Sequence, residues 1–336
     1  MNIQSLGDLA QTFKMRQQNA QLKQQMARLT EELTSGQAAD VTRQLSGNFG
    51  HLSDIEHDLK ALESYRTSAI EIGVVTTAMQ DALEYVQTLA GDLGANAVIS
   101  GTTSGGLPLS AVSEQGRGAL DSIISAMNTE VSGRYLFSGT DIEARPLESA
   151  DTLLTEIRTA IAGAATAADV VTALDTFFDT PGGSFETLIY QGGTTFLSPY
   201  QLGEGESVRL DIRADNTAIR NVLKNTAMAA LADDPLITLS NAERVELAQQ
   251  SGERLVTSQE TVIGIRSNLG FAQSRVEQSA TRISAETSSL EFARNELLSV
   301  DKFRTATELE NVQVQLETLY TLTARASRFS LVNFLS

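Results

Sequence analysis

Apolar residues recur at helical spacing near both ends of the 336-residue chain. Near the C-terminus, apolar and small residues step by three and four positions from Leu309 to Ala326, which is the period of a coiled-coil seam. Near the N-terminus, a seven-residue frame of apolar residues runs from Met15 to Leu33, with Asn19 in its gap. Both ends are therefore predicted to be long amphipathic helices.

The distribution of Gly and Pro agrees with this prediction. All five prolines lie between Pro108 and Pro235, and residues 271–336 contain neither Gly nor Pro. Inside a helix Pro costs about 3 kcal/mol and Gly about 1 kcal/mol relative to Ala. A run of this length permits helices of up to about 100 Å. A helix over residues 8–35 is expected to end at Gly36.

A single amphipathic helix in water leaves its apolar stripe exposed, and helix propensity rarely compensates for this. Either the two ends pair with each other, or each waits for a helix of another subunit. The first solution predicts a mainly α fold, an elongated bundle of long helices formed by the paired N- and C-terminal arms, with a small inserted mixed α/β domain.

The middle of the chain contains the prolines and most of the turn signals, so shorter elements are expected there. Helices are expected at 110–131, within 149–179, and after an N-terminal cap at Asn216. Residues 101–108 are expected to form a loop. Short strands are expected at Thr187–Tyr190, Thr194–Leu197 and Val208–Ile212.

We therefore expect three domains. Residues 1–140 form an N-terminal helical arm, which holds a terminal assembly segment and part of the bundle. Residues 141–238 form the inserted mixed α/β domain. Residues 239–336 form a C-terminal helical arm that completes the bundle and carries the second assembly segment.

Charge separates the ends from the middle. The chain has a net charge of −17, whereas residues 1–30 carry four cations against one anion and residues 318–336 carry two cations and no anion. A surface this acidic repels phosphate, so nucleic-acid binding is not expected. The basic ends favour an environment different from that of the middle, although ordinary variation of surface charge is an equal alternative.

Candidate chemistry is scarce. There is no Cys, and His51 and His57 lie six residues apart, about 240° around a helix, which does not suit a shared metal ion. None of the five lysines follows a Gly, so no phosphate-binding loop is predicted. The acidic pairs Asp233–Asp234 and Asp211/Asp215 are expected to serve capping or turns. We expect no catalytic, cofactor or metal site, and a protein that is not an enzyme.

No membrane-spanning stretch and no cleavable secretory signal are visible in the sequence, because no run approaches 18 apolar residues and the start lacks a basic region followed by an apolar one. Membrane insertion is therefore not expected.

Short motifs at both ends resemble the bacterial flagellin family. The segments Leu29–Gly36, Gly264–Gly270 and Ser299–Leu309 are similar to the family's helix ends and helix starts. The segments Gly133–Thr140 and Phe329–Leu335 are similar to the stretches "G.YLF.GT" and "SLL.YL" of the hook–filament junction branch, hook-associated protein 3. The sequence departs from the flagellin pattern at Gln37–Val41 and at Ser274, which favours the junction branch over filament flagellin.

The resemblance implies a structural subunit of the bacterial flagellum, exported to the cell exterior without a cleaved signal. Its implied partners are flagellin, a sister hook-associated junction protein, the flagellar export apparatus with its chaperone, and further copies of itself in a ring. The terminal helices of this family pack between subunits. The residues expected at that assembly interface are Met15, Leu22, Met26, Leu29, Leu33, Leu309, Val312, Leu316, Leu319, Phe329, Leu331, Phe334 and Leu335.

Two other functions fit the same patterns. A filament flagellin would share both arms and would polymerise alone. A soluble coiled-coil adaptor would use the same apolar seam inside one chain, with termini that are ordered in the free protein. For Leu309–Leu319 in particular, an intramolecular core is the competing interpretation.

Overall fold

A computed structural model describes residues 3–100 and 106–335, with side chains described for 10–100 and 106–325. The chain divides into two compact units. The terminal unit comprises Met1–Glu63 with Ala285–Ser336, and the central unit comprises Ser64–Ser284. Helices α3 (Gly50–Val98) and α8 (Asn241–Leu298) each contribute residues to both units.

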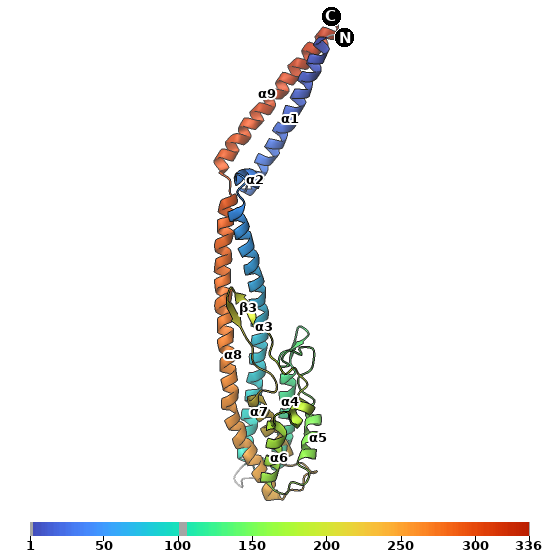
Figure 1. Ribbon diagram of the computed structural model, residues 1–336, viewed down its shortest axis with the longest axis vertical. Coiled ribbons are helices and arrows are strands. Elements are labelled where there is room, and N and C mark those ends of the chain that lie inside the picture. Colours follow the sequence, from blue (N-terminus) through green and yellow to red (C-terminus); the bar gives the residue numbers. More distant parts are fainter. Residues whose placement is uncertain (1–2, 101–105, 336) are drawn as a thin grey trace. The chain divides into compact units, whose positions relative to one another are not determined.

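The terminal unit is built on two long helices, α1 (Ile3–Ser35) and α9 (Lys302–Leu335), which run side by side (Figure 1). The short helix α2 (Val41–Gln44) follows α1. As predicted, α1 ends before Gly36, whose φ of +73° is the left-handed conformation that favours glycine at a helix end. The predicted pairing of the two arms is confirmed.

Residues 271–335, which contain no Gly or Pro, form the end of one helix and the whole of another. Helix α8 ends at Leu298 and α9 begins at Lys302. Between them the backbone N–H of Val300 donates to the Gly36 carbonyl, at 3.1 Å, and Ser299 forms an isolated β-bridge with Gln37. Hydrogen bonds from a distant part of the chain thus replace the helical ones at this break.

In the central unit, parts of α3 and α8 surround one core together with α4 (Leu109–Met127) and α7 (Thr217–Leu231). Helix α4 packs closely on α7, because a methyl group at Gly116 would come within 2.7 Å of the Ala230 backbone nitrogen. The predicted cap is present, since the Asn216 side chain accepts a hydrogen bond from the Ala218 N–H at 2.9 Å.

Two shorter helices complete this core. Helix α5 (Ala150–Ala160) begins at a Ser149 cap, and α6 (Ala167–Asp179) begins at a capping box formed by Thr166 and Asp169. The π-helical turn η1 (Phe185–Ile189) follows.

The described strands form two small antiparallel sheets. Strand β1 (Glu130–Val131) pairs with β2 (Arg134–Tyr135), and β3 (Tyr200–Gly203) pairs with β4 (Glu206–Val208). The register of the second pair shifts between Gln201 and Gly203.

The predicted strands were placed incorrectly. Residues 187–189 belong to η1, where the Tyr190 N–H donates to the Phe185 carbonyl at 2.9 Å, and Thr194–Leu197 is irregular. Only Val208 of the third predicted strand pairs in a sheet. Ile189 and Ile212 still reach the core, whereas Leu188 and Phe196 are exposed.

The fold class is confirmed as mainly α, with long bundled helices and a small strand-containing region. The three-domain division at residues 140/141 and 238/239 stays a prediction. The expected loop at 101–108 lies largely outside the described residues. None of the helices in the described ranges combines the length and apolar character needed to cross a bilayer.

Candidate assembly interface

The predicted seam forms inside the terminal unit. Leu29, Val312 and Leu316 are each less than one-tenth exposed and form one apolar cluster between α1 and α9. Leu319 is buried to a similar extent. Three partly buried predicted residues pack against the cluster, namely Leu22, Met26 and Leu309. The structure therefore brings the centre of the predicted residue set together within one chain.

The predicted interface residues at the two ends of the seam are less buried. Met15 and Leu33 are half-buried, and the Thr323 hydroxyl lies 3.8 Å from the Met15 sulfur. The remaining predicted interface residues lie outside those with described side chains, namely Phe329, Leu331, Phe334 and Leu335.

This seam is narrow. Burying an aliphatic side chain is worth about 2 kcal/mol, and isolated helices are marginal in water. Ordering one residue costs about 1–2 kcal/mol in backbone entropy. A cluster of three buried residues is small against the length of α1 and α9, so the helix pair would gain stability from any partner that buries more of it.

An open hollow lies beside the seam. Its volume is about 430 Å³, and its walls come from both α1 and α9. Val314 and Leu322 line it and are 61% and 50% exposed, respectively. Three glutamine side chains of α1 also line it, namely Gln18, Gln21 and Gln25. Val314 is two residues, or about 200°, from Val312, so α9 has apolar residues on two faces.

A backbone connection fixes the register of the two helices. The Ala38 N–H donates to the Leu298 carbonyl at 2.9 Å, beside the bond from Val300 to Gly36. One Asp301 carboxylate oxygen accepts from the backbone N–H groups of Phe303 and Arg304, which caps α9. The position of the seam residues on α9 relative to those on α1 follows from this connection.

A buried carboxylate strengthens the end of α1. Glu32 is 3% exposed, and its carboxylate lies 2.8 Å from the Arg28 guanidinium and 3.7 Å from that of Arg43. Arg28 and Glu32 are four residues apart on one helix face. Sequence reasoning missed this contact, although the i, i+4 spacing of opposite charges was visible.

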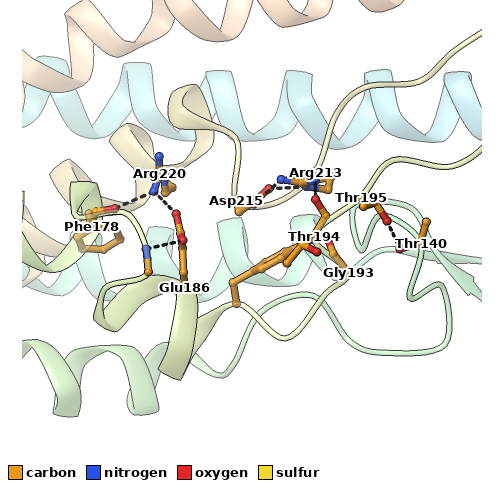
Figure 2. Close-up of polar contacts among 11 residues, drawn as sticks. Thr140, Phe178, Glu186, Gly193, Thr194, Thr195, Arg213, Asp215 and Arg220 are labelled. Atoms are coloured by element: carbon orange, nitrogen blue, oxygen red, sulfur yellow. Dashed lines mark hydrogen bonds and ion pairs between the residues drawn. The ribbon is translucent and has the colours of Figure 1, made fainter.

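The glycine-flanked motif at residues 133–140 folds into the core of the central unit. Phe137 is fully buried, and Gly139 has a φ of +65°. A Cβ atom at Gly139 would lie 2.6 Å from the Thr195 carbonyl oxygen, so this close approach requires glycine. Figure 2 shows Thr140 beside Thr195, with their hydroxyl groups 2.9 Å apart.

Two arginines hold the neighbouring loops. Arg213 makes a bidentate contact with Asp215, donates to the Thr194 carbonyl and lies 4.5 Å from the centre of the Phe196 ring. The hydrogen bond to Asp215 raises the pKa of Arg213 above its ordinary value. Figure 2 shows Arg220 bridging the Phe178 carbonyl and the Glu186 carboxylate.

Burial is the largest cause of the raised pKa of two tyrosines, Tyr190 and Tyr200. The Tyr190 hydroxyl donates to the Gly193 carbonyl at 2.9 Å, and burial followed by the nearby Asp215 charge raises its pKa. Burial and then the Glu71 charge raise the pKa of Tyr200. The Tyr190 hydroxyl is thus a buried, protonated donor to the Gly193 carbonyl.

The acidic pairs that were expected to serve capping or turns lie next to arginines. Asp234 is 1% exposed and lies 2.7 Å from Arg158 and 3.5 Å from Arg117. Asp233 pairs with Arg244 at 2.8 Å. His51 and His57 are exposed, and the described residues include no group of His, Cys, Asp or Glu side chains that could hold a metal ion.

A model of the bacterial flagellin C-terminal helical region matches residues 253–335, which span most of α8 and α9. The resemblance to the flagellin family is confirmed for this segment. The matched segment contributes the α9 residues of the seam and of the hollow. It also contributes Leu298 and Val300, which form the backbone hydrogen bonds to the end of α1. The C-terminal part of the chain is therefore similar to the helical region of flagellin.

Two solved structures are also similar to the chain. A putative flagellar hook-associated protein from Vibrio parahaemolyticus aligns with a TM-score of 0.49 and 12% identity, covering 73% of this chain and 95% of the other. Bacillus cereus FlgL aligns with a TM-score of 0.49 and 18% identity, covering 70% and 96%. No curated protein matches the chain.

Proposed function

We propose that this chain is a structural subunit that joins the flagellar hook to the filament through packing of its terminal helices against neighbouring subunits. The observation that carries the proposal is the hollow between α1 and α9, where Val314 and Leu322 are exposed beside a narrow buried seam. A helix of a second subunit in this hollow would cover both side chains, as a third strand does in a coiled coil.

The proposed partners follow from this role. They are flagellin on one side, a sister hook-associated junction protein on the other, and further copies of this chain in a ring. We also propose that the chain reaches the cell exterior through the flagellar export apparatus, helped by a chaperone and without a cleaved signal. In this proposal the chain has no catalytic role.

A charge placed in the hollow tests the proposal without disturbing the seam. In a strain that lacks the native gene, Val314→Lys is expected to leave α1 and α9 paired but to release filaments from the hook, because a lysine would be desolvated when a partner helix docks. The matched control is Phe303→Lys, since Phe303 is 84% exposed on the same helix and does not line the hollow. Equally firm filaments with both variants would contradict the proposal.

Removal of residues 318–336 tests the same role at the end of the chain. The truncated protein is expected to be made and exported but to give cells whose filaments detach. If filaments remain firmly attached, the tail is not an assembly element.

A filament flagellin is the second candidate, and the match to the flagellin C-terminal region favours it. Purified chain added to filament fragments would elongate them if this candidate is correct. In the junction proposal, the chain caps the fragments and does not elongate them.

A further inference from the structure

Helices α8 and α9 are separated by a break of three residues, Ser299, Val300 and Asp301. Residues 285–298 and 302–335, on the two sides of the break, belong to the terminal unit, and α9 leaves the end of α8 in a new direction (Figure 1). None of the three residues is Gly or Pro, the residues that oppose a helix most strongly. The local sequence therefore permits one continuous helix through the break.

The apolar pattern also permits a continuous helix. Leu290 and Leu297 of α8 are partly buried, and Thr305 of α9 is buried. These residues follow one another in steps of seven and eight positions. On one uninterrupted helix, at 100° per residue, the three side chains would lie within about 80° of one another. A continuous helix would thus keep them on one face.

Two backbone hydrogen bonds hold the break from a distant part of the chain. They come from residues 36–44, which follow α1 and include α2, and which we name the connector. The Ala38 N–H donates to the Leu298 carbonyl at 2.9 Å, and the Val300 N–H donates to the Gly36 carbonyl at 3.1 Å. In a continuous helix, the Leu298 carbonyl and the Val300 N–H would instead pair with groups four residues away. The connector and the continuous helix therefore compete for the same backbone groups.

Side chains of the connector add to these bonds. The Gln44 side chain donates to the Ser299 carbonyl at 3.1 Å, and the Gln37 side chain donates to that of Asn295 at 3.3 Å. The Ser299 carbonyl is a further group that a continuous helix would use. All of these contacts would be lost together if the connector moved away.

The start of α9 has a local cap that favours the break. One Asp301 carboxylate oxygen accepts from the backbone N–H groups of Phe303 and Arg304, at 3.0 Å and 3.2 Å. This cap does not involve the connector. The balance is therefore between the cap together with the connector on one side and the helical hydrogen bonds through residues 299–301 on the other.

We infer that the break between α8 and α9 is a two-state element that the connector controls. With the connector in place, α8 and α9 are two helices. When α1 and the connector move away, residues 299–301 become helical and α8 continues into α9. The direction of α9 thus depends on whether α1 is in place. The inference concerns a single chain and does not rest on the proposed function.

Distances between pairs of spin labels test this inference in the full-length chain, which has no natural cysteine. The spanning pair, Glu296→Cys with Glu310→Cys, places labels at two exposed positions on either side of the break. The reference pair, Phe303→Cys with Glu317→Cys, has the same spacing of fourteen residues at exposed positions within α9. Fourteen residues of straight helix span about 21 Å. We expect the reference pair to show this helical distance, and the spanning pair of the natural sequence to show mainly a different one.

The variant Ala38→Pro removes the N–H that donates to the Leu298 carbonyl. We expect it to raise the ratio of the helical distance to the other distance in the spanning pair about fivefold, which is the effect of one hydrogen bond. Adding Gln44→Ala should raise this ratio further. The matched control is Ala39→Pro, because the Ala39 N–H donates no hydrogen bond within the described part of the chain.

A second proline distinguishes a continuous helix from a general loss of order. Lys302 is the first residue of α9, a position that accepts proline, so Lys302→Pro leaves the broken state intact. Inside a continuous helix, the same proline would clash with the Leu298 carbonyl. Adding Lys302→Pro to Ala38→Pro should therefore return the helical distance to its level in the natural sequence or below.

Three results would overturn the inference. The spanning pair could show the helical distance already in the natural sequence, in which case the connector does not hold the break. The variant Ala38→Pro could match Ala39→Pro, or could give a broad distribution without the helical distance. Finally, a gain of the helical distance that persists when Lys302→Pro is added would show that residues 299–301 do not become helical.

Discussion

The two units of this chain use long helices in different ways. The central unit buries large aromatic side chains, among them Phe137, Phe178 and Phe185, in a core shared by many elements. Between its two terminal helices, the terminal unit buries a small cluster of aliphatic side chains centred on Leu29 and Val312. The central unit therefore supplies its own stability, whereas the terminal unit retains apolar surface that a neighbour can cover.

Core truncations should show the largest difference between the units. The centre of the Phe178 ring lies 5.2 Å from that of Phe177 and 5.1 Å from that of Phe185, so Phe178→Ala would leave a cavity in the core. We expect it to lower the free energy of unfolding by about 4 kcal/mol, against about 2 kcal/mol for Leu316→Ala in the seam. Urea unfolding measured separately for each unit would compare them, and equal losses would contradict the difference in core.

The two buried carboxylates offer a second comparison. Asp234→Ala would leave Arg158 and Arg117 without their shared partner and the Leu236 N–H without its acceptor, at a cost of about 3 kcal/mol. Glu32→Ala in the terminal unit is expected to cost about 1 kcal/mol, because Arg43 is 59% exposed and stays hydrated. Thermal unfolding of both variants checks this order, and the reverse order would contradict it.

Replacing a glycine is expected to change stability by a smaller amount, and in opposite directions in the two units. Gly36→Ala places a Cβ atom on a residue with positive φ and should destabilise the helix pair by about 1 kcal/mol. Gly118→Ala in α4 is the control, since no atom lies within 4 Å of the added Cβ and the helix should gain up to about 1 kcal/mol. Amide exchange in α1 and α9 should rise for the first variant only, and unchanged exchange would show that Gly36 does not hold the pair.

The smallest effect is a pH dependence in the central unit. Hydrogen bonds with the Thr166 side chain, and then with the backbone of Ala165 and Thr166, hold the pKa of Asp169 below its ordinary value of 3.8. A lowered pKa in the folded state stabilises the fold above the unfolded value, and this stabilisation is lost as the pH falls through the folded value. The melting temperature of Asp169→Asn should therefore approach that of the natural chain only below pH 3.8. A constant difference at all pH values would contradict this.

The sequence was most informative where the structure is periodic. Steps of three and four identified Val312, Leu316 and Leu319 as one face of a helix, and all three are buried. The same pattern cannot tell whether the covering helix belongs to the same chain or to another, because both bury an identical stripe. Exposed apolar residues of α8 such as Phe271 were not identified from the sequence, because a solvent-facing apolar residue does not interrupt a helical pattern.

Non-local contacts explain the errors. The break at Ser299 lacks Gly and Pro, and it forms because backbone bonds to Gly36 and Ala38 compensate for the lost helical ones. The segment Thr187–Tyr190 has the composition of a strand, yet the burial of Phe185 and Ile189 in the core turns it into part of a π-helical turn. Neither contact leaves a signal within a short window of sequence.

If the proposed function is correct, the α1–α9 pair completes its burial only between subunits. Hydrogen–deuterium exchange of residues 10–35 and 302–325 tests it directly, with the dilute free chain compared with the same chain in isolated flagella. We expect weak protection of these helices in the free chain and strong protection in the assembly, while the central unit is strongly protected in both. Strong and equal protection of the terminal helices in the dilute chain would contradict it and would favour a self-contained coiled-coil adaptor.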